Sequence, residues 1–354
     1  MKVNGIIAEY NPFHNGHLYQ LQESARLTDC DYTVIVMSGD FVQRGAPALA
    51  DKRVRAQAAL RCGADLVLEL PVLYATASAE FFAAGAVALL DRLNVVTHLC
   101  FGSECGDARA LGQIGEALSH ETSHYRAALK ASLRQGSTYP AARAQALAAS
   151  ARSALPEGFE GLLSWPNNIL AIEYIRALSR LGSQILPVTV RRLGAGYHDA
   201  CLGEGAASAQ SACSALALRQ AMRQGGSLEQ LAAHMPGEAH SLLAAYLDTE
   251  KPLYCDDFSS LLYYKLCMEE ASGYVRYLDV SCGLSDRIRK HLRFYTGFEA
   301  FCDMLKTKDM TYARISRCLL HILLGIEKAD MERGRSIGNA PYARVLGFRR
   351  SAAP

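Results

Sequence analysis

The first hundred residues alternate apolar runs with stretches whose apolar residues recur at helical spacing. In the first of these stretches, Leu18, Leu21 and Ala25 fall on one helical face. Continuous apolar strands that alternate with amphipathic helices are typical of a parallel sheet covered on both faces. The predicted strands are residues 2–10, 31–39, 64–71 and 95–104, and the predicted helices are residues 14–28, 51–63 and 78–93.

The pattern changes after this alternation. Residues 107–160 are rich in alanine and predict helices, and a longer helix is predicted to begin near Pro166 and to end before Gly182. A fifth strand is predicted at 185–194. It is followed by a Gly-, Ala- and Ser-rich segment, residues 194–215, which predicts a mobile surface loop.

From about residue 214 onward the pattern is helical throughout, with no convincing strand. We therefore expect residues 1–205 to form an α/β domain with a parallel sheet, and residues 206–354 to form a mostly α-helical domain. Ligands of such sheets bind at the carboxyl ends of the strands. A binding site is expected at that edge of the first domain.

Composition narrows the class of protein. Half of the 354 residues are hydrophobic and a fifth are charged, as in an ordinary globular protein. No apolar run approaches the roughly 18 residues of a membrane helix, and the N-terminus lacks a signal-peptide pattern, so we expect a cytoplasmic location. The eleven cysteines include no Cys-x-x-Cys pair. Their apolar surroundings predict small buried thiols rather than a metal site.

The charge is distributed unevenly along the chain. The net charge is only +2, but from Gly273 to the end 15 Lys and Arg face 8 Asp and Glu, a net of +7. A basic C-terminal part suggests a polyanionic partner, because phosphates attract arginine and lysine over long range. A surplus of arginine on solvated helical surfaces is the alternative interpretation.

Two histidines, His14 and His17, flank Asn15 and Gly16 where the first strand is followed by the first helix. The free N–H groups and the positive end of the helix dipole make such a turn an anion site. Two imidazoles beside it can donate hydrogen bonds to phosphoryl oxygens, and phosphoryl transfer needs mainly positioning and charge stabilisation. The rival interpretation is that both histidines are exposed or cap the helix.

This His-x-Gly-His sequence resembles the signature of the class I nucleotidyltransferase superfamily. Four segments together are similar to the tRNA(Met) cytidine acetate ligase family, over nearly the whole chain. They are GIIAEYNPFHNGHLYQL at 5–21, SGDFVQRGAPA at 38–48, SWPNNILAIEYIRAL at 164–178 and TYARISRCLLHILLGI at 311–326.

The resemblance implies a Rossmann-like, ATP-binding catalytic domain at 1–205 and a basic tRNA-binding domain at 206–354. It implies that acetate attacks the α-phosphorus of ATP, releasing pyrophosphate, and that the resulting acetyl-adenylate acetylates the exocyclic amine of the wobble cytidine of elongator tRNA(Met). Mg²⁺ is expected with the triphosphate, and no stable protein partner is expected. His14 and His17 would stabilise the transition state. The segment expected to bind ATP is Ile7, Ala8, Glu9, Tyr10, Asn11, Pro12, Phe13, His14, Asn15, Gly16, His17, Leu18, Tyr19 and Gln20.

Five further residues are candidates for the nucleotide site. Gly102 ends the fourth strand, where a side chain would block an adenosine; a tight turn is the alternative. Asn167 and Asn168 lie at a helix start, so one is expected to cap the helix and the other to contact the nucleotide. Arg191 and Arg192 end the fifth strand. Because strand residues alternate between faces, only one of them is expected to hold a phosphate.

A polar loop after the second strand contains Asp40, Gln43 and Arg44. It is a candidate to bind magnesium, acetate or tRNA, with a solvated loop as the alternative. In the basic part, cations and aromatic residues cluster in two helical segments, where cations would contact phosphates and aromatics could stack on an unpaired base. The expected tRNA-binding residues are Arg287, Arg289, Lys290, Arg293, Tyr312, Arg314 and Arg317, with Phe294 and Tyr295 available for stacking.

The superfamily's second motif, a Ser/Thr-rich loop that ends in Arg or Lys, has no clear copy here, so other residues must hold the triphosphate. Two other functions stay open. One is an adenylyltransferase that acts on a small metabolite, although such an enzyme needs no basic helical domain. The other is an RNA-binding protein with a vestigial nucleotide site, although the intact His-Asn-Gly-His sequence argues against it.

Overall fold

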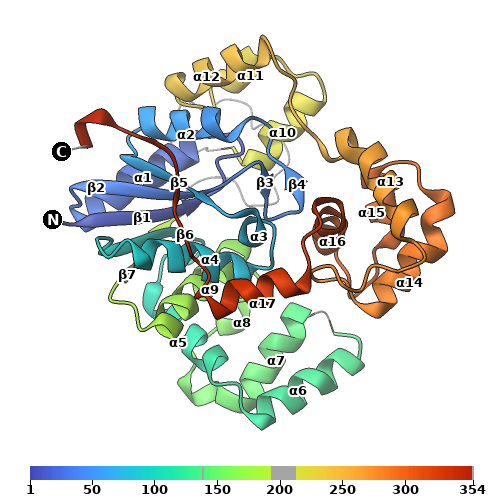
Figure 1. The fold of residues 1–354 in the computed structure, drawn as a ribbon. Helices are drawn as coiled ribbons and strands as arrows, with labels where there is room; N and C mark the ends of the chain where they lie inside the picture. Colours follow the sequence, from blue (N-terminus) through green and yellow to red (C-terminus); the bar gives the residue numbers. More distant parts are fainter. Residues whose placement is uncertain (138, 193–212, 353–354) are drawn as a thin grey trace.

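The computed structural model describes residues 1–137, 139–192 and 213–352. Within these ranges six strands form one sheet in the order β7-β6-β1-β2-β5-β8 (Figure 1). The five predicted strands are all present and pair in parallel, as predicted. They are β1 (Val3–Ala8), β2 (Tyr32–Ser38), β5 (Leu66–Leu70), β6 (His98–Ser103) and β7 (Leu186–Arg191), and two short strands, β3 (Phe41–Val42) and β4 (Ala46–Pro47), form a separate hairpin.

The sixth strand, β8 (Arg344–Phe348), corrects the prediction that the chain is helical throughout after residue 214. It pairs antiparallel with β5 at the edge of the sheet, where Leu66 lies opposite Phe348. All five of its residues are exposed or half-buried. A short edge strand of this kind lacks the buried apolar run or the clear alternation that identifies a strand from sequence.

Helices cover both faces of the sheet, and successive strand residues face opposite helical layers. Ile7 packs in a cluster with the layer of α4 and α9, whereas Ile6 packs with the layer of α1 and α2. The first layer consists of α3 (Val72–Ala75), α4 (Ala79–Arg92), α5 (Ala108–Ser119), α9 (Pro166–Leu181) and α17 (Lys328–Ser336). The second consists of α1 (Asn15–Thr28), α2 (Lys52–Arg61), α10 (Ala215–Arg223), α11 (Leu228–Ala232) and α12 (Gly237–Leu247). No helix in the described ranges has the length and apolarity to cross a membrane.

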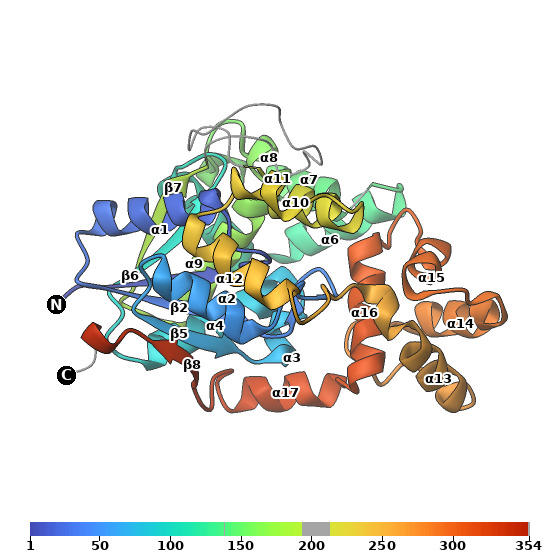
Figure 2. The ribbon, with the colours of Figure 1, turned by 90° about the horizontal axis from the view of Figure 1, so that it is seen from above.

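Two groups of helices extend from this core. The first, which we call the arm, is α6 (Ser123–Arg134) and α7 (Tyr139–Ala151), followed by the short α8 (Phe159–Leu162). The second, which we call the helical body, has its own hydrophobic cluster and lies beyond the carboxyl ends of the strands in Figures 1 and 2. It consists of α13 (Ser259–Glu269), α14 (Cys282–His291), α15 (Phe298–Leu305) and α16 (Tyr312–Leu324).

The expected boundary between residues 205 and 206, and most of the expected surface loop at 194–215, lie outside the described residues. On the far side of this gap, α10 to α12 pack in the same hydrophobic cluster as β1, β2 and α2, through residues such as Ala217, Leu218 and Leu243. Part of the segment expected to belong to a second domain therefore covers the sheet.

Candidate active site

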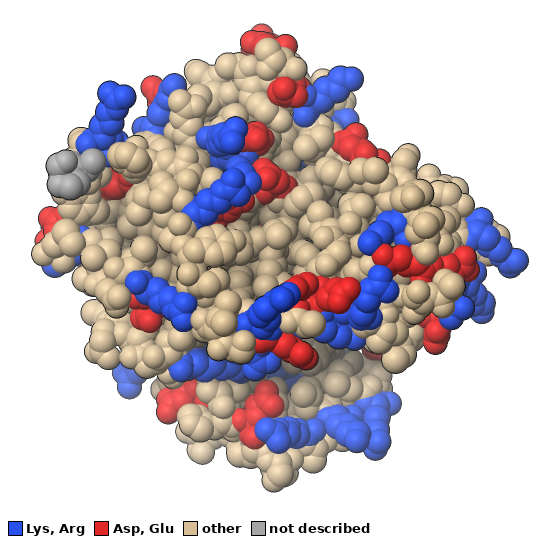
Figure 3. Space-filling view, viewed as in Figure 1, with Lys and Arg blue, Asp and Glu red and all other residues tan. Residues whose placement is uncertain are grey.

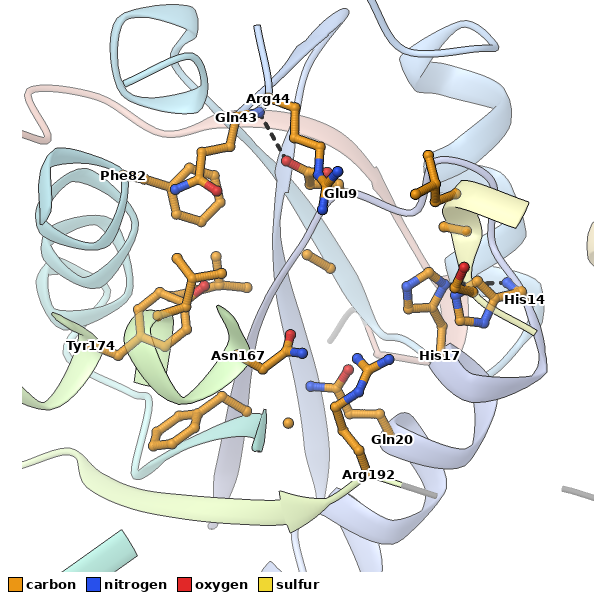
Figure 4. A pocket seen from close by; sticks show the side chains of 18 of the residues that line it. Glu9, His14, His17, Gln20, Gln43, Arg44, Phe82, Asn167, Tyr174 and Arg192 are labelled. Carbon is orange, nitrogen blue, oxygen red and sulfur yellow. Dashed lines mark hydrogen bonds between the residues drawn. The ribbon is translucent and has the colours of Figure 1, made fainter. Parts of the chain in front are cut away.

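A pocket lies where the order of the strands reverses. The chain proceeds from β1 to β2 and β5 on one side and then returns to β6 and β7 on the other, which is the point at which open α/β sheets bind ligands. The cavity encloses about 190 Å³ and opens to solvent (Figure 4). Of the expected site residues, those that line it are Ile7, Ala8, Glu9, His14, His17, Gln20, Gln43, Arg44, Gly102, Asn167 and Arg192.

The two histidines form one end of this pocket, and they also cap α1. His14 is the N-cap residue, and its Nδ1 accepts a hydrogen bond from the Gly16 backbone N–H at 3.0 Å. His17 Nδ1 accepts from the His14 backbone N–H at 3.2 Å. The two rings stack with centroids 3.7 Å apart (Figure 4). Capping and a role in the pocket were treated as rival interpretations, but the structure combines them.

The capping bonds fix the tautomer of both rings. Because each Nδ1 accepts a hydrogen bond, a neutral ring must carry its proton on Nε2. Burial, followed by the charges of Arg192 and Arg219, lowers the pKa of His14 to about 3. Burial, His14 and Arg192 likewise hold the pKa of His17 well below its ordinary value. Both imidazoles are therefore neutral Nε2–H donors at physiological pH.

Aromatic residues before the helix hold the His17 ring in place. Tyr10 and Phe13 are buried, and their ring centroids lie 4.9 Å and 5.6 Å from that of His17. Asn11 is also buried, and its Oδ1 accepts a hydrogen bond from the Leu49 N–H at 2.8 Å. These residues of the expected nucleotide segment do not line the cavity. Tyr10 and Phe13 instead pack against His17, which does line it.

Three arginines line the pocket, one from each of three segments of the chain: Arg44, Arg192 and Arg219. Arg219, on α10, donates from Nη1 to the Asn11 carbonyl oxygen at 2.6 Å. Arg219 was not among the expected site residues, because residues after 205 were expected to form a separate helical domain. The combination of three cations with two neutral N–H donors is suited to a ligand with several negative charges, such as a chain of phosphates.

The two asparagines at the start of α9 have different roles, and neither caps it as expected, since Trp165 is the N-cap residue. The Glu104 carboxylate instead accepts from the backbone N–H groups of both, and also from Asn167 Nδ2 at 2.6 Å. Asn168 is fully buried, and its Oδ1 accepts from the Glu104 N–H at 3.0 Å. Asn167 lines the pocket (Figure 4).

Gly102 and the arginines at the end of β7 lie on neighbouring strands of the sheet. Gly102 lies within β6, and a Cβ there would meet Arg192 Cγ at 3.6 Å, an ordinary contact. The tight-turn alternative therefore does not apply, and the space beside this glycine belongs to the pocket. Arg192 lines the pocket. Arg191 instead packs beside Gly106, and a Cβ added to that glycine would lie 3.1 Å from the Cβ of Arg191. The alternation expected from the strand separates the two arginines.

The three candidate residues of the polar loop do not all lie in the pocket. Gln43 and Arg44 line the pocket, and the Gln43 N–H donates to Glu9 Oε1 at 2.9 Å (Figure 4). Asp40 instead pairs with Lys52 Nζ at 2.8 Å, and the same ammonium group contacts Glu69 at 2.9 Å. In the ranges that the structure describes, no group of three or more His, Cys, Asp or Glu side chains could hold a metal ion.

Comparison with known proteins identifies the family of this chain. The family model described as HIGH Nucleotidyl Transferase matches residues 1–353. A tRNA(Met) cytidine acetate ligase of Clostridium kluyveri is 42% identical over 354 residues, which cover 98% of this chain and 84% of the relative. One of a Thermoanaerobacter species is 43% identical over 349 residues, 98% of this chain and 83% of the relative. The chain belongs to the tRNA(Met) cytidine acetate ligase family.

Solved structures match this family member over almost its whole length. A crystal structure of Thermotoga maritima TmcAL bound with alpha-thio ATP superposes with a TM-score of 0.89 at 34% identity, covering 99% of this chain and 81% of that one. The apo form of the Thermotoga maritima protein gives a TM-score of 0.91 at 35% identity, with coverage of 99% and 82%.

The residues expected to bind tRNA in this ligase-family member lie on the helical body, away from the pocket lining. Arg289, Lys290 and Arg293, on α14 and the turn after it, are exposed, and the Arg293 guanidinium lies 4.6 Å from the centre of the half-exposed Phe294 ring. On α16, Tyr312 and Arg314 are exposed. Arg287 and Arg317 are partly buried, with their Nε atoms inaccessible, and Tyr295 bonds to Ser259.

Proposed function

We propose that this chain is an ATP-dependent ligase that activates acetate as acetyl-adenylate and transfers the acetyl group to the exocyclic amine of the wobble cytidine of elongator tRNA(Met). The observation that carries the proposal is the stacked pair of neutral Nε2–H imidazoles among three arginines at the switch point of the sheet. The names of the relatives support the choice of acid and tRNA, and the alpha-thio ATP of the Thermotoga maritima structure supports the nucleotide.

In the first step the acetate oxygen attacks the α-phosphorus and pyrophosphate leaves. Negative charge then builds up on the phosphoryl oxygens, where hydrogen-bond donors stabilise the transition state more than the ground state. His14 and His17 supply two such donors, and Arg192 and Arg219 supply positive charge beside them. Arg219 compensates for the absent Ser/Thr-rich motif, because it adds a cation from a helix outside the expected nucleotide-binding segment.

The hairpin residues bind the acid. A carboxylate is recognised best by a guanidinium or amide donor, and Arg44 and Gln43 bring both to the pocket, next to Glu9. Among the described lining residues Glu9 is the one carboxylate. The site therefore fits an Mg²⁺ ion held mainly by the triphosphate, with Glu9 as its protein ligand, and such an ion would neutralise phosphoryl charge.

In the second step the cytidine amine attacks the acetyl carbonyl carbon, the bond between that carbon and the phosphate oxygen breaks so that AMP leaves, and the amine gives up one proton to the solvent to which the pocket opens. Neither ring of the histidine pair carries a positive charge at neutral pH. The pair can therefore continue to donate hydrogen bonds to the departing phosphate without a change of protonation. The exposed residues Arg289, Lys290, Arg293, Tyr312 and Arg314 of the helical body bind the tRNA that delivers the amine.

The test is to incubate purified protein with ATP, radiolabelled acetate and bulk tRNA. Label in tRNA is expected. Acetyl-adenylate without labelled tRNA would limit the activity to the first step, and the absence of both products would refute the proposal. His17→Ala is expected to reduce adenylate formation at least 100-fold, since positioned transition-state donors typically contribute about that much. Exposed His120, at the end of α5, provides the matched control as His120→Ala.

A further inference from the structure

The arm formed by α6 and α7 has no part in the function proposed above, yet the chain enters and leaves this region through elements that line the pocket. The chain leaves the sheet at the end of β6, which contains Gly102, and reaches the arm through α5. It returns through α8 to the start of α9, which contains Asn167, and both Gly102 and Asn167 line the cavity. In Figure 1 the arm lies below the sheet, with the helical body to the right of the sheet.

The arm is strongly basic. Residues 122–154 contain five Lys and Arg and no Asp or Glu. Three of the cations, Arg126, Lys130 and Arg134, recur at every fourth position of α6, and all three are exposed. Four residues advance about 6 Å along a helix, so these side chains form a regular line of positive charge about 12 Å long along one side of the helix.

The positive charge of this line is not neutralised by strong ion pairs with other described residues. No ion pair joins Lys130 or Arg134 to a carboxylate of the described residues, whereas Arg126 Nε lies 3.6 Å from Glu121 with 70% of the arginine side chain exposed. Such a solvated pair contributes little. Leu129 and Leu133 lie between the cations along a shallow groove. The surface therefore combines positive charge with a small apolar area, and no described carboxylate neutralises the charge by a close, buried ion pair.

We propose that Arg126, Lys130 and Arg134 bind the phosphate backbone of the tRNA substrate, as a second contact surface apart from the helical body. The inference rests on the proposed function. Figure 3 shows Lys and Arg side chains on the lower lobe of α6 and α7 and on the right lobe of the helical body, with a hollow between the lobes. Phosphate contacts position a nucleic acid without reading its sequence. Two such surfaces beside one pocket hold a tRNA whose anticodon base enters the pocket.

The test uses the full chain with the triple variant Arg126→Gln, Lys130→Gln and Arg134→Gln. Its dissociation constant for an elongator tRNA(Met) transcript is measured from 50 to 300 mM KCl. We expect weakening of about tenfold or more at low salt, and a log–log salt slope shallower by about 2 to 3, because each lost phosphate contact removes about one counterion from the slope. Acetate-dependent exchange of pyrophosphate into ATP should stay within about twofold of the wild type.

The control neutralises three exposed cations on other elements, namely Lys2 before β1, Arg26 in the last turn of α1 and Arg350 after β8, as Lys2→Gln, Arg26→Gln and Arg350→Gln. In Figure 1 both chain termini lie at the left of the sheet, away from the arm below it and the helical body to its right. The control carries the same change in net charge and should bind tRNA within about twofold of the wild type. If the arm variant does not fold, the single variants Lys130→Gln and Arg134→Gln replace it, each with an expected slope change of about 1.

The outcomes separate the two proposals. Wild-type protein that neither binds nor acetylates tRNA refutes the proposed function, and this inference with it. Wild-type protein that acetylates tRNA, while the arm variant binds tRNA with unchanged affinity and salt slope, refutes this inference alone. Equal weakening in the arm variant and the control also refutes it, since the effect would then be one of net charge.

Discussion

Arg55 provides a strict test of how the pocket is held. This α2 residue is almost fully buried, and its guanidinium donates to four backbone carbonyl groups. Nε bonds to Ala50 at 3.0 Å, Nη1 to Glu9 at 2.6 Å and to Ser38 at 3.1 Å, and Nη2 to Gly39. It therefore joins the carboxyl ends of β1 and β2 to the segment that contains the hairpin. Burial lowers its pKa to about 10, which leaves it charged at neutral pH.

Arg55→Met removes the donors and keeps an aliphatic chain of similar length. Four buried carbonyl groups then lose a partner at about 1 kcal/mol each, and relief from burying a charge returns about 1 kcal/mol, so a net loss of about 3 kcal/mol is expected. Arg55→Lys keeps the charge but cannot reach all four oxygens, and should lose less. Arg53→Met, at an exposed position one residue after the start of the same helix, should lose less than about 0.5 kcal/mol.

Urea unfolding followed by circular dichroism measures these differences. Acetate-dependent pyrophosphate exchange, measured on the folded variants, tests the functional consequence. The KM for acetate should rise in Arg55→Met because Glu9 and the hairpin lose their shared support. The reasoning would be wrong if Arg55→Met were within about 1 kcal/mol of the wild type, or if Arg53→Met were equally destabilised.

Three further predictions concern the site. The unfolded His14 imidazole binds a proton below pH 6.5, whereas the folded one binds it only near pH 3. Lowering the pH from 7 to 5 should therefore reduce the free energy of unfolding by about 2 kcal/mol. The urea midpoint of His14→Asn should fall by correspondingly less over the same pH range. Ser316→Ala removes the 2.7 Å bond to the Gly45 carbonyl that docks the hairpin on α16, so pyrophosphate exchange should give a higher KM for acetate and an unchanged KM for ATP. Glu104→Gln replaces an acceptor of three N–H groups and should raise the KM for ATP several-fold, whereas an unchanged value would separate Asn167 from nucleotide binding.

Much of the fold followed from the sequence because the four central parallel strands, β1, β2, β5 and β6, are largely buried on both sides. The runs at β2 and β5 are mostly apolar, and β1 contains the apolar Ile6, Ile7 and Ala8 in succession, so these strands are easy to recognise. The strand β8 could not be recognised in the same way, because its position is fixed by backbone pairing with β5, far away in the sequence, and not by burial of its own side chains.

The candidate site was predictable to the extent that it is local in sequence. His14, Gly16 and His17 lie at the predicted helix start, where position and spacing indicated an anion site and left helix capping as the alternative, and the role of the histidines in the reaction came from the family resemblance. The asparagines at α9 could not be assigned, because the group that bonds to their N–H donors is Glu104, about 60 residues earlier in the chain. Helix-capping rules consider only neighbouring residues, so they assigned to an asparagine a role that a distant carboxylate performs.

The contribution of Arg219 to the pocket could not be predicted from the sequence either. In the sequence it is one arginine in a helical stretch, with nothing nearby that indicates a phosphate site. It reaches the pocket because Ala217 and Leu218, on the buried side of α10, pack against the sheet core, and this orientation directs Arg219 to the Asn11 carbonyl. The position of the cation is thus set by apolar neighbours. Replacing Leu218 with alanine should therefore weaken ATP binding as well as stability, although the leucine does not line the pocket.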